Sequence, residues 1–401
     1  MIHRYDITIT GGGMTGLALA CALGQQGMRV AVLEAGATPA PFDPDGGPDL
    51  RVVAINRASQ ALLHHLGAWP KLRRWRLSPY DRMHVRDAGS RSSITFSAAE
   101  LGEPDLGHII ENRLIQRALY EVAEQLETVA WFDHIEIANL GVDEHDAVIT
   151  LADGRVFTSR LIVGADGRFS RVREAAGIEV HSRDYQQQAI VATVTTEQSS
   201  DRTAWQRFLP DGVLAFLPLA DGRSSIVWSS RRADEILALD DDAFREALGE
   251  AFDFHLGKVL DTSARAAFPL IGRHAERYVE PRLALIGDAA HTIHPLAGQG
   301  VNLGFMDVAE LATVLAATGR DPGSLSVLRR YERARKGENA MMQKLMEGFQ
   351  LLFLNDTTPL RQLRGLGLAV TEQIPPAKAL MMRYAMGTMG QLPTLAQYRP
   401  G

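Results

Sequence analysis

The sequence predicts an α/β protein in which a dinucleotide-binding domain holds an inserted β-sheet-rich part and is followed by a helical C-terminal region. Two glycine-bearing segments, at residues 11–16 and 287–300, each follow a strand pattern and precede a helix pattern. Between them, residues 185–270 carry mainly strand patterns, so a β-rich part interrupts one α/β domain. At roughly 150 residues per domain, 401 residues allow two to three domains.

Composition excludes several classes of protein. The 42 Lys and Arg against 48 Asp and Glu leave a net charge of -6, which argues against nucleic acid as a partner. Cys21 is the only cysteine, so an intrachain disulfide and a cysteine metal cluster are excluded, and we expect a reducing, cytoplasmic compartment. We expect Cys21 to be a small core residue, and we expect no bilayer-spanning helix.

The first 35 residues predict a βαβ unit with strands at 6–10 and 29–33 and a helix at 15–26. The motif Gly11-Gly12-Gly13-Met14-Thr15-Gly16 has the spacing G-x-G-x-x-G, in which glycines allow a tight turn and close approach of a pyrophosphate to a helix N-terminus. Glu34 ends the second strand, where an acid accepts hydrogen bonds from an adenosine ribose. An ordinary glycine-rich turn is the alternative.

Two further motifs indicate which dinucleotide binds. Leu161-Ile162-Val163-Gly164-Ala165-Asp166-Gly167, followed by Ser170 and Arg173, resembles the Asp-Gly motif of flavin-dependent aromatic hydroxylases. Leu285-Ile286-Gly287-Asp288-Ala289-Ala290-His291, followed by Pro295, Gly298, Gln299, Gly300 and Asn302, resembles their Gly-Asp motif. The resemblance implies a Rossmann-like FAD-binding domain of the p-hydroxybenzoate hydroxylase type.

Three runs narrow the resemblance to the ubiquinone-biosynthesis hydroxylases, which act on the ring of a polyprenylated phenol. These are residues 50–56 (LRVVAIN), 107–112 (GHIIEN) and 291–307 (HTIHPLAGQGVNLGFMD). Within that family the chain is most similar to the 2-polyprenylphenol hydroxylases, which oxidise the ring carbon numbered C5 or C6. The resemblance covers essentially the whole chain.

The resemblance also implies which residues hold FAD. Asp288 would hydrogen-bond the ribityl chain, with helix capping as the alternative, and Asp166 would lie near the ribityl chain and pyrophosphate, with a plain Asp-Gly turn as the alternative. Arg51 would lie near flavin or nicotinamide, and a surface ion pair is nearly as compatible with the sequence. The helix beginning near Gly300 would stabilise negative charge on reduced flavin. The expected cofactor-binding residues are Gly11, Gly13, Met14, Thr15, Gly16, Glu34, Arg51, Asp166, Gly287, Asp288, Pro295, Gly298, Gln299, Gly300, Val301 and Asn302.

No catalytic base is identified. The candidates for facing the substrate cavity are His291, His294, Pro295 and Pro218. His291 and His294 have no third ligand candidate nearby, so we expect no metal. The hairpin formed by residues 213–219 and 224–229, with Phe216, Leu217, Pro218, Val227 and Trp228, is either a wall over the flavin or plain core.

The resemblance implies that FAD is reduced by transiently bound NAD(P)H, reacts with O2 to give a C4a-hydroperoxide, and delivers OH to a phenolic ring. No second G-x-G-x-x-G is present for the nicotinamide. The expected FAD domain comprises residues 1–75, 106–178 and 276–340, and the β-rich substrate domain comprises residues 76–105 and 179–275.

Residues 341–401 form the expected C-terminal helical region, with seven of the twelve methionines and six basic against three acidic residues. This region would hold a polyprenyl tail, touch an anionic membrane, contact other ubiquinone-biosynthesis enzymes, or simply cap the FAD domain. Two other functions remain open: hydroxylation of a small soluble aromatic, and a non-catalytic FAD-binding subunit.

Overall fold

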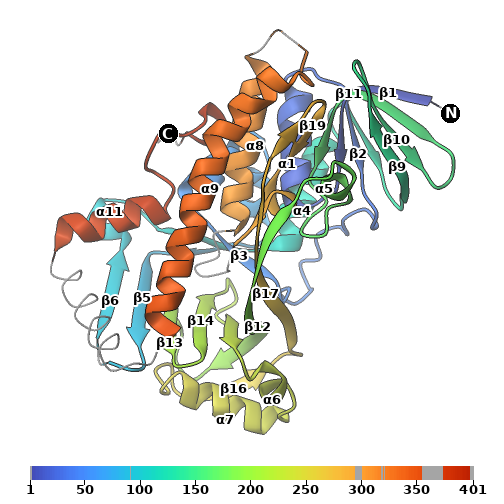
Figure 1. Ribbon diagram of the computed structural model, residues 1–401. Helices are drawn as coiled ribbons and strands as arrows, with labels where there is room; N and C mark the ends of the chain where they lie inside the picture. The colour runs from blue at the N-terminus through green and yellow to red at the C-terminus, as the bar shows by residue number, and fades with distance from the viewer. Residues whose placement is uncertain are drawn as a thin grey trace.

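The computed structural model describes residues 2–90, 92–293, 300–317, 319, 321–354 and 374–397, without the side chains of residues 349–354, 375 and 377 (Figure 1). The strands are β1 (Ile2–Thr10), β2 (Val30–Leu33), β3 (Val52–Ile55), β4 (Ser78–Tyr80), β5 (Arg82–Asp87), β6 (Ser93–Ser97), β7 (Gly107–Glu111), β8 (Val129–Phe132), β9 (Ile137–Val142), β10 (Ala147–Leu151), β11 (Val156–Gly164), β12 (Val180–Thr196), β13 (Thr203–Leu209), β14 (Gly212–Pro218), β15 (Ser224–Ser230), β16 (Val259–Thr262), β17 (Ala266–Ala275), β18 (Val279–Glu280), β19 (Leu283–Leu285) and β20 (His291–Thr292). The helices are α1 (Met14–Gln25), α2 (Arg57–His65), α3 (Trp69–Arg74), α4 (Asn112–Ala123), α5 (Arg171–Ala175), α6 (Ala233–Leu237), α7 (Asp241–Ala251), α8 (Gly300–Ala316), α9 (Leu325–Leu354) and α11 (Pro375–Ala385), with 3-10 turns η1 (Ala98–Leu101), η2 (Gly287–Ala289) and η4 (Thr394–Ala396).

The first sheet has the order β18-β19-β11-β1-β2-β8, with β10 and β9 added beside β11. Strands β19, β11, β1, β2 and β8 run parallel. All of β2 and β19 and the carboxyl-terminal four residues of β1 and β11 are buried, because helices and the rest of the domain cover them. Thr10 pairs with Gly164, and Gly164 pairs with Leu285. The three glycine- or aspartate-bearing motifs therefore leave the sheet at the same edge, beyond the carboxyl ends of neighbouring strands.

The second sheet has the order β20-β17-β12-β15-β14-β13-β5-β6, with β16 beside β12. Its strands come from residues 82–97, 180–275 and 291–292, so the inserted part also recruits the strand that follows the Gly-Asp motif. Helices α6 and α7 cover its far face, where they enclose a separate apolar core with strand residues such as Ile190, Leu214 and Trp228 (Figure 1). A small sheet, β3-β7-β4, completes the fold.

The expected architecture is confirmed: an α/β domain with a largely parallel sheet carries an inserted β-rich part. The hairpin expected at residues 213–229 is present as β14 and β15, which pair antiparallel from Gly212↔Ser230 to Pro218↔Ser224. Cys21 is buried in α1, its thiol donates to the Leu119 carbonyl at 3.3 Å, and burial raises its pKa to about 12. It is the core residue that the sequence predicts.

Helix α9 runs past residue 340 without interruption, so the proposed division at 340/341 does not fall at a helix end. Of residues 341–401, the structure describes the end of α9 and residues 374–397, which contain the helix α11, a stretch of turns and the short turn η4. No helix within the described ranges combines the length and apolar character needed to cross a bilayer.

Candidate FAD and substrate site

The glycine loop between β1 and α1 is packed too tightly for side chains at two positions. Gly11 has φ +95°, and a Cβ there would lie 2.4 Å from the Ala165 carbonyl oxygen. A Cβ on Gly16 would lie 1.9 Å from the carbonyl oxygen of Gly11. Gly13 differs, because a Cβ there would meet nothing within 4 Å and would project toward the cavity that Gly13, Met14 and Thr15 line. No side chain caps the N-terminus of α1, so its backbone N–H groups are available to an anion.

Glu34 lies beside this loop, as its position at the end of β2 predicts. Its Oε2 accepts from the Gly12 backbone N–H at 2.5 Å, and its Oε1 accepts from that of Gly36 at 2.7 Å. Each carboxylate oxygen has capacity for a second hydrogen bond, so these contacts orient Glu34 without preventing it from binding a ribose.

Asp166 follows β11 and lines the same cavity. Its Oδ2 accepts from the N–H groups of Arg171 and Val172 at 2.8 and 3.2 Å, so it caps α5. Its Oδ1 is buried and has no hydrogen-bond partner among the described residues, and burial raises the pKa of the carboxyl. A donor from outside the chain, such as a ribityl hydroxyl, would satisfy that oxygen.

Asp288 lies in the 3-10 turn η2, and its side chain is accessible from the cavity. The residue that caps η2 is Ile286, so Asp288 is not the helix cap of the alternative interpretation. Desolvation raises the pKa of the carboxyl, against the lowering effect of His291 and Arg51. Arg173 links the Asp-Gly and Gly-Asp motifs by donating to the Ala289 carbonyl at 2.8 Å.

Gly300 and Val301, at the start of α8, also line the cavity, and a Cβ on Gly300 would meet nothing within 4 Å. Asn302 instead points into the protein, where it donates to the Ala54 carbonyl at 2.8 Å and accepts from the Asn56 N–H at 3.1 Å. It therefore ties α8 to the end of β3. His294, Pro295, Gly298 and Gln299 lie outside the described residues.

His291 does not line the cavity. Its Nε2 lies 2.5 Å from Oδ2 of Asp307, and both side chains are buried. Hydrogen bonds also join Asp307 to Arg335 and Asn339 of α9. The structure thus places His291 in a buried polar cluster behind the Gly-Asp turn. In the part of the chain that is described, no three His, Cys, Asp or Glu side chains converge as a metal site requires.

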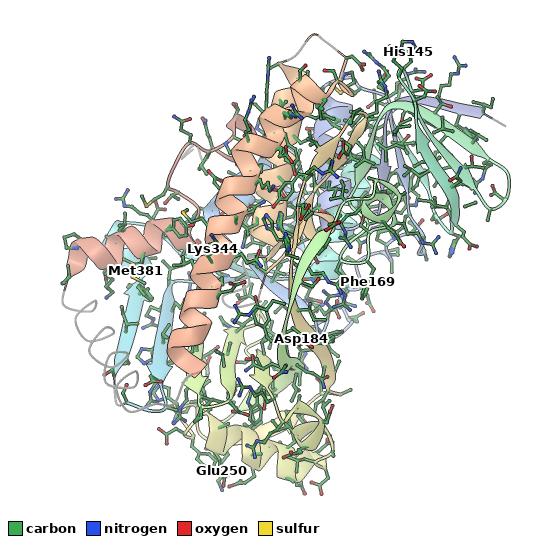
Figure 2. All side chains as sticks on the ribbon, viewed as in Figure 1. His145, Phe169, Asp184, Glu250, Lys344 and Met381 are labelled. Carbon is green, nitrogen blue, oxygen red and sulfur yellow. The ribbon has the colours of Figure 1, made fainter. Side chains whose placement is uncertain are left out.

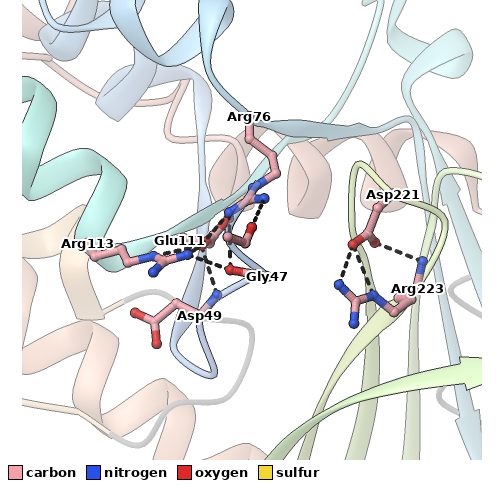
Figure 3. A network of polar contacts seen from close by, with 8 residues as sticks. Gly47, Asp49, Arg76, Glu111, Arg113, Asp221 and Arg223 are labelled. Carbon is pink, nitrogen blue, oxygen red and sulfur yellow. Dashed lines mark hydrogen bonds and ion pairs between the residues drawn. The ribbon is translucent and has the colours of Figure 1, made fainter. Parts of the chain in front are cut away.

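Arg51 lines the cavity with its guanidinium carbon 5.4 Å from the centroid of the Phe268 ring. A network of charges holds the loop that leads to it (Figure 3). Buried Glu111 accepts from Arg76 Nε at 2.7 Å, from Arg113 Nε at 3.0 Å and from the Asp49 N–H at 2.8 Å. The two arginines also donate to the carbonyl of Gly47. Three of these bonds reach the loop itself, two to the Gly47 carbonyl and one from the Asp49 N–H, and they hold it between Arg76, β7 and α4.

The hairpin β14–β15 is both wall and core, because side chains alternate along a strand. Ala215, Leu217 and Val227 line the cavity. Phe216 and Trp228 point to the opposite face and belong to the core beneath α6 and α7. Pro218 is buried and does not line the cavity.

One cavity of about 1540 Å³ is continuous from the glycine loop, Asp166 and Asp288 to Arg51 and the β14–β15 hairpin. This exceeds the range of roughly 300–1,000 Å³ for ordinary ligand pockets, so it has room for more than one group. One end is bounded by the glycine loop, Asp166, Asp288 and the start of α8. We call the other end the apolar arm; its lining includes Met83, Val85, Ile94 and Phe96 of β5 and β6, Phe208 and Val213 of β13 and β14, Met341, Met342, Leu345 and Met346 of α9, and Leu380, Met381, Met382, Met386 and Met389 of α11 and the turn after it.

Sequence reasoning missed most of this arm. The alternation of Met83 and Val85 in β5, and of Ile94 and Phe96 in β6, is the signal of two half-buried strands. Sequence reasoning also missed Asp307, Arg335 and Asn339. The one indication in the sequence is that these polar residues occur on helix faces that are otherwise apolar.

These features match known proteins. The sequence model of the FAD-binding-domain family matches residues 4–345. The chain is 41% identical over 389 residues to 3-demethoxyubiquinol 3-hydroxylase of Escherichia coli K12, covering 95% of this chain and 98% of that one. It is 39% identical over 393 residues to ubiquinone hydroxylase UbiL of Rhodospirillum rubrum, covering 96% and 90%. The solved structure of p-nitrophenol 4-monooxygenase PnpA from Pseudomonas putida has a TM-score of 0.79 at 18% identity, covering 96% and 98%, which shows the fold.

The fold, the dinucleotide motifs and these matches define an FAD-dependent aromatic monooxygenase. Within that class, the chain belongs to the family of FAD-dependent hydroxylases of ubiquinone biosynthesis. The family resemblance carried by the three motifs is thereby confirmed.

Proposed function

We propose that this chain hydroxylates the aromatic ring of a polyprenylated phenol, with 2-polyprenylphenol as substrate and C5 (C6) as the position. The observation that carries the proposal is the single cavity that joins the FAD-motif residues to the apolar arm. An arm lined by methionine and aliphatic side chains suits a flexible hydrocarbon tail, because methionine adapts to irregular apolar surfaces. Each buried methylene contributes about 0.8 kcal/mol, so the tail would dominate binding.

Bound FAD would supply the activation of O2, and the protein would supply position and environment. The backbone N–H groups at the start of α1 would bind the pyrophosphate, Glu34 the adenosine ribose, and Asp166 and Asp288 the ribityl chain. The backbone N–H groups at the start of α8, near Gly300, would stabilise negative charge on the flavin ring. Leu217 and Val227 would exclude water from the reacting ring.

A second substrate, 3-demethoxyubiquinol, is supported by a specific observation. The relative that is 41% identical over nearly its full length is named as a hydroxylase of that compound. Both candidates share a prenylated ring, so both suit the same arm. They differ in ring substituents, which would contact the cavity wall between Arg51 and Leu217.

We propose NAD(P)H as the transient electron donor. Phe169 is 69% exposed at the mouth of the cavity, with the guanidinium carbons of Arg168 and Arg273 at 5.0 and 4.7 Å from its ring centroid (Figure 2). Positive charge suits the phosphates of a dinucleotide, and the aromatic face suits a nicotinamide ring.

We also propose a cytoplasmic enzyme that touches a membrane surface, or partner enzymes of the pathway, through residues 341–401. Exposed apolar side chains gather where the arm reaches α9 and α11, and Lys344 and Arg383 are exposed basic residues of the same two helices. Figure 2 labels Lys344 on α9 and Met381 on α11. The apolar members are Met341, Leu345, Leu380, Met381 and Met389. Apolar area flanked by positive charge suits an anionic bilayer, from which a polyprenylated substrate would enter.

The test is inactivation of the gene, followed by mass spectrometry of the lipid extract. An accumulated prenylated intermediate that lacks one ring oxygen supports the proposal, and its other substituents distinguish 2-polyprenylphenol from 3-demethoxyubiquinol. Unchanged quinone, in cells with no other hydroxylase able to substitute, contradicts it and favours a small soluble aromatic. A purified protein that binds FAD but never turns over would favour a non-catalytic subunit.

A further inference from the structure

Helix α9 contacts both ends of the cavity. It packs on α8 and β18 in the FAD domain and reaches β13 in the second sheet (Figure 1). Near its start, the Tyr331 hydroxyl donates to the Leu285 carbonyl at 2.7 Å, and Glu332 accepts from the Tyr278 N–H at 2.8 Å. The helix is therefore fastened to the strands that precede the Gly-Asp motif.

One turn further on, α9 holds the Gly-Asp turn itself through Asp307 of α8. Oδ1 of Asp307 accepts from Arg335 Nε at 2.9 Å and from Asn339 Nδ2 at 3.1 Å. Oδ2 accepts from the Gly287 backbone N–H at 3.1 Å and lies 2.5 Å from His291 Nε2. All of these side chains are buried, so one carboxylate bridges α9 to the backbone of the turn.

The turn held in this way points Asp288 into the cavity. Gly287 has φ +57°, and a Cβ there would lie 3.1 Å from the Thr15 side chain, so the turn also packs against the start of α1. A displacement of Gly287 would therefore change both the Asp288 carboxylate and the neighbouring phosphate end of the site.

The same face of α9 then lines the apolar arm. Positions 335, 339, 342 and 346 are spaced by four, three and four residues and so form one stripe along the helix. Met342 and Met346 are buried there against residues such as Val85, Phe208 and Leu303. At 1.5 Å per residue, Met342 lies only about 4.5 Å further along the axis than Asn339.

We propose that Asp307, Arg335 and Asn339 are positioning residues that couple occupancy of the apolar arm to the flavin-binding turn. Removing one partner of a buried charged contact leaves the other uncompensated, so α9 and the turn move together rather than separately. A tail packed on Met342 and Met346 fixes the position of α9. Because α9 is bonded to the turn through Asp307, it also fixes the positions of Gly287 and Asp288. The inference rests on the proposed function and adds a physical connection between the FAD end of the cavity and the apolar arm.

Coupling of this kind is reciprocal, so it is measurable without turnover. FAD is titrated into the purified protein, followed by flavin fluorescence, with no addition, with 2-farnesylphenol or with tail-free 2-methylphenol. The farnesyl compound should tighten FAD binding at least about fivefold, and FAD should tighten binding of the farnesyl compound by the same factor. The tail-free phenol should have an effect of less than twofold, since it cannot reach the arm.

The variant Asn339→Ala should reduce the coupling factor below twofold. Tyr331→Phe is the matched control, because it removes a hydrogen bond from the same helix to the strand and not to the turn, and it should keep the wild-type factor. Arg335→Lys, which keeps the charge and loses the bond geometry, replaces Asn339→Ala if that variant does not fold. An unchanged coupling factor in a folded Asn339→Ala or Arg335→Lys protein overturns the inference. A wild-type protein that binds FAD but not 2-farnesylphenol contradicts the proposed substrate instead.

Discussion

The substitution Gly13→Ala should lower the affinity for FAD without lowering the stability of the apoprotein. Gly13 has φ -71°, and a Cβ there meets nothing within 4 Å, so alanine fits the backbone without strain. A Gly→Ala change at a compatible position stabilises the folded state by about 0.4–1 kcal/mol through the unfolded chain. The new methyl group would nevertheless project into the space over the start of α1, where the pyrophosphate is proposed to bind.

The magnitude follows from the size of the chain. At about 2.1 cal/mol/K per residue, the unfolding entropy of 401 residues is roughly 0.8 kcal/mol/K. FAD at 100 times its Kd stabilises the wild type by about 2.7 kcal/mol, which raises Tm by about 3 °C. If the methyl group weakens binding tenfold, the same FAD concentration contributes about 1.4 kcal/mol, and the rise in Tm falls to about half.

The assay is thermal melting of the apoprotein with and without FAD, for three variants. Gly141→Ala, on β9 with open space around it, is the control and should keep the full FAD-induced rise. Gly16→Ala should melt lower even without FAD, because its Cβ would lie 1.9 Å from the Gly11 carbonyl oxygen. Overpacking of this kind costs about 1–3 kcal/mol. A full FAD-induced rise in Gly13→Ala would refute the placement of the pyrophosphate.

Three further outcomes are expected. Burial acts to raise the pKa of the Asp307 carboxyl, but its contacts with His291 and Arg335 outweigh burial and hold that pKa at about 2, below the ordinary value of 3.8. A lowered carboxyl pKa stabilises the protein above the unfolded pKa by about 2 kcal/mol, and this is lost as pH falls toward 2. Asp307→Asn should therefore be less stable than the wild type in urea at pH 7, with a gap that narrows below pH 4; a gap that widens in acid would contradict this assignment. Met346→Glu places a charge in the apolar arm and should raise KM for 2-farnesylphenol at least about tenfold while leaving FAD affinity within about twofold; equal effects on a tail-free phenol would show that the arm does not hold the tail. Leu217→Trp should reduce kcat for all phenols by filling the space over the ring, whereas Phe216→Leu, on the opposite face of the strand, should change melting temperature and leave KM unchanged.

The FAD end of the site is predictable from the sequence because each of its motifs is local. A glycine turn, an Asp-Gly pair and a Gly-Asp pair each follow a recognisable strand, and parallel strands bring their carboxyl ends to one edge. The helix expected at residues 15–26 is present as α1, whose bounds differ by one residue at each end, and α8 begins at Gly300 as expected.

The apolar arm is not predictable in this way. Its lining comes from β5, β13, α9 and α11, which are spread along the chain from residue 82 to residue 385, and no local pattern predicts that they meet. The methionine-rich composition predicts soft apolar packing, and only the fold shows what it packs around. The hairpin β14–β15 shows the same limit. The alternation of side chains along a strand predicts that the hairpin has two different faces, but only the fold shows that Leu217 faces the cavity and Phe216 the core.

His291 shows a different limit. Its place in the Gly-Asp motif suggests a residue that faces the substrate, whereas the structure buries it against Asp307. The partner lies on the next helix, and the sequence has no signal that pairs the two side chains.

Mass spectrometry of the reaction product tests most directly whether this chain inserts one oxygen atom from O2 into the ring of a prenylated phenol. The purified, FAD-loaded protein is given 2-farnesylphenol, NAD(P)H and ¹⁸O₂. We expect one ¹⁸O atom per hydroxylated ring and little product from 2-methylphenol under the same conditions. Product that lacks ¹⁸O, or ¹⁸O incorporated into 2-methylphenol as readily as into the farnesyl compound, would contradict it.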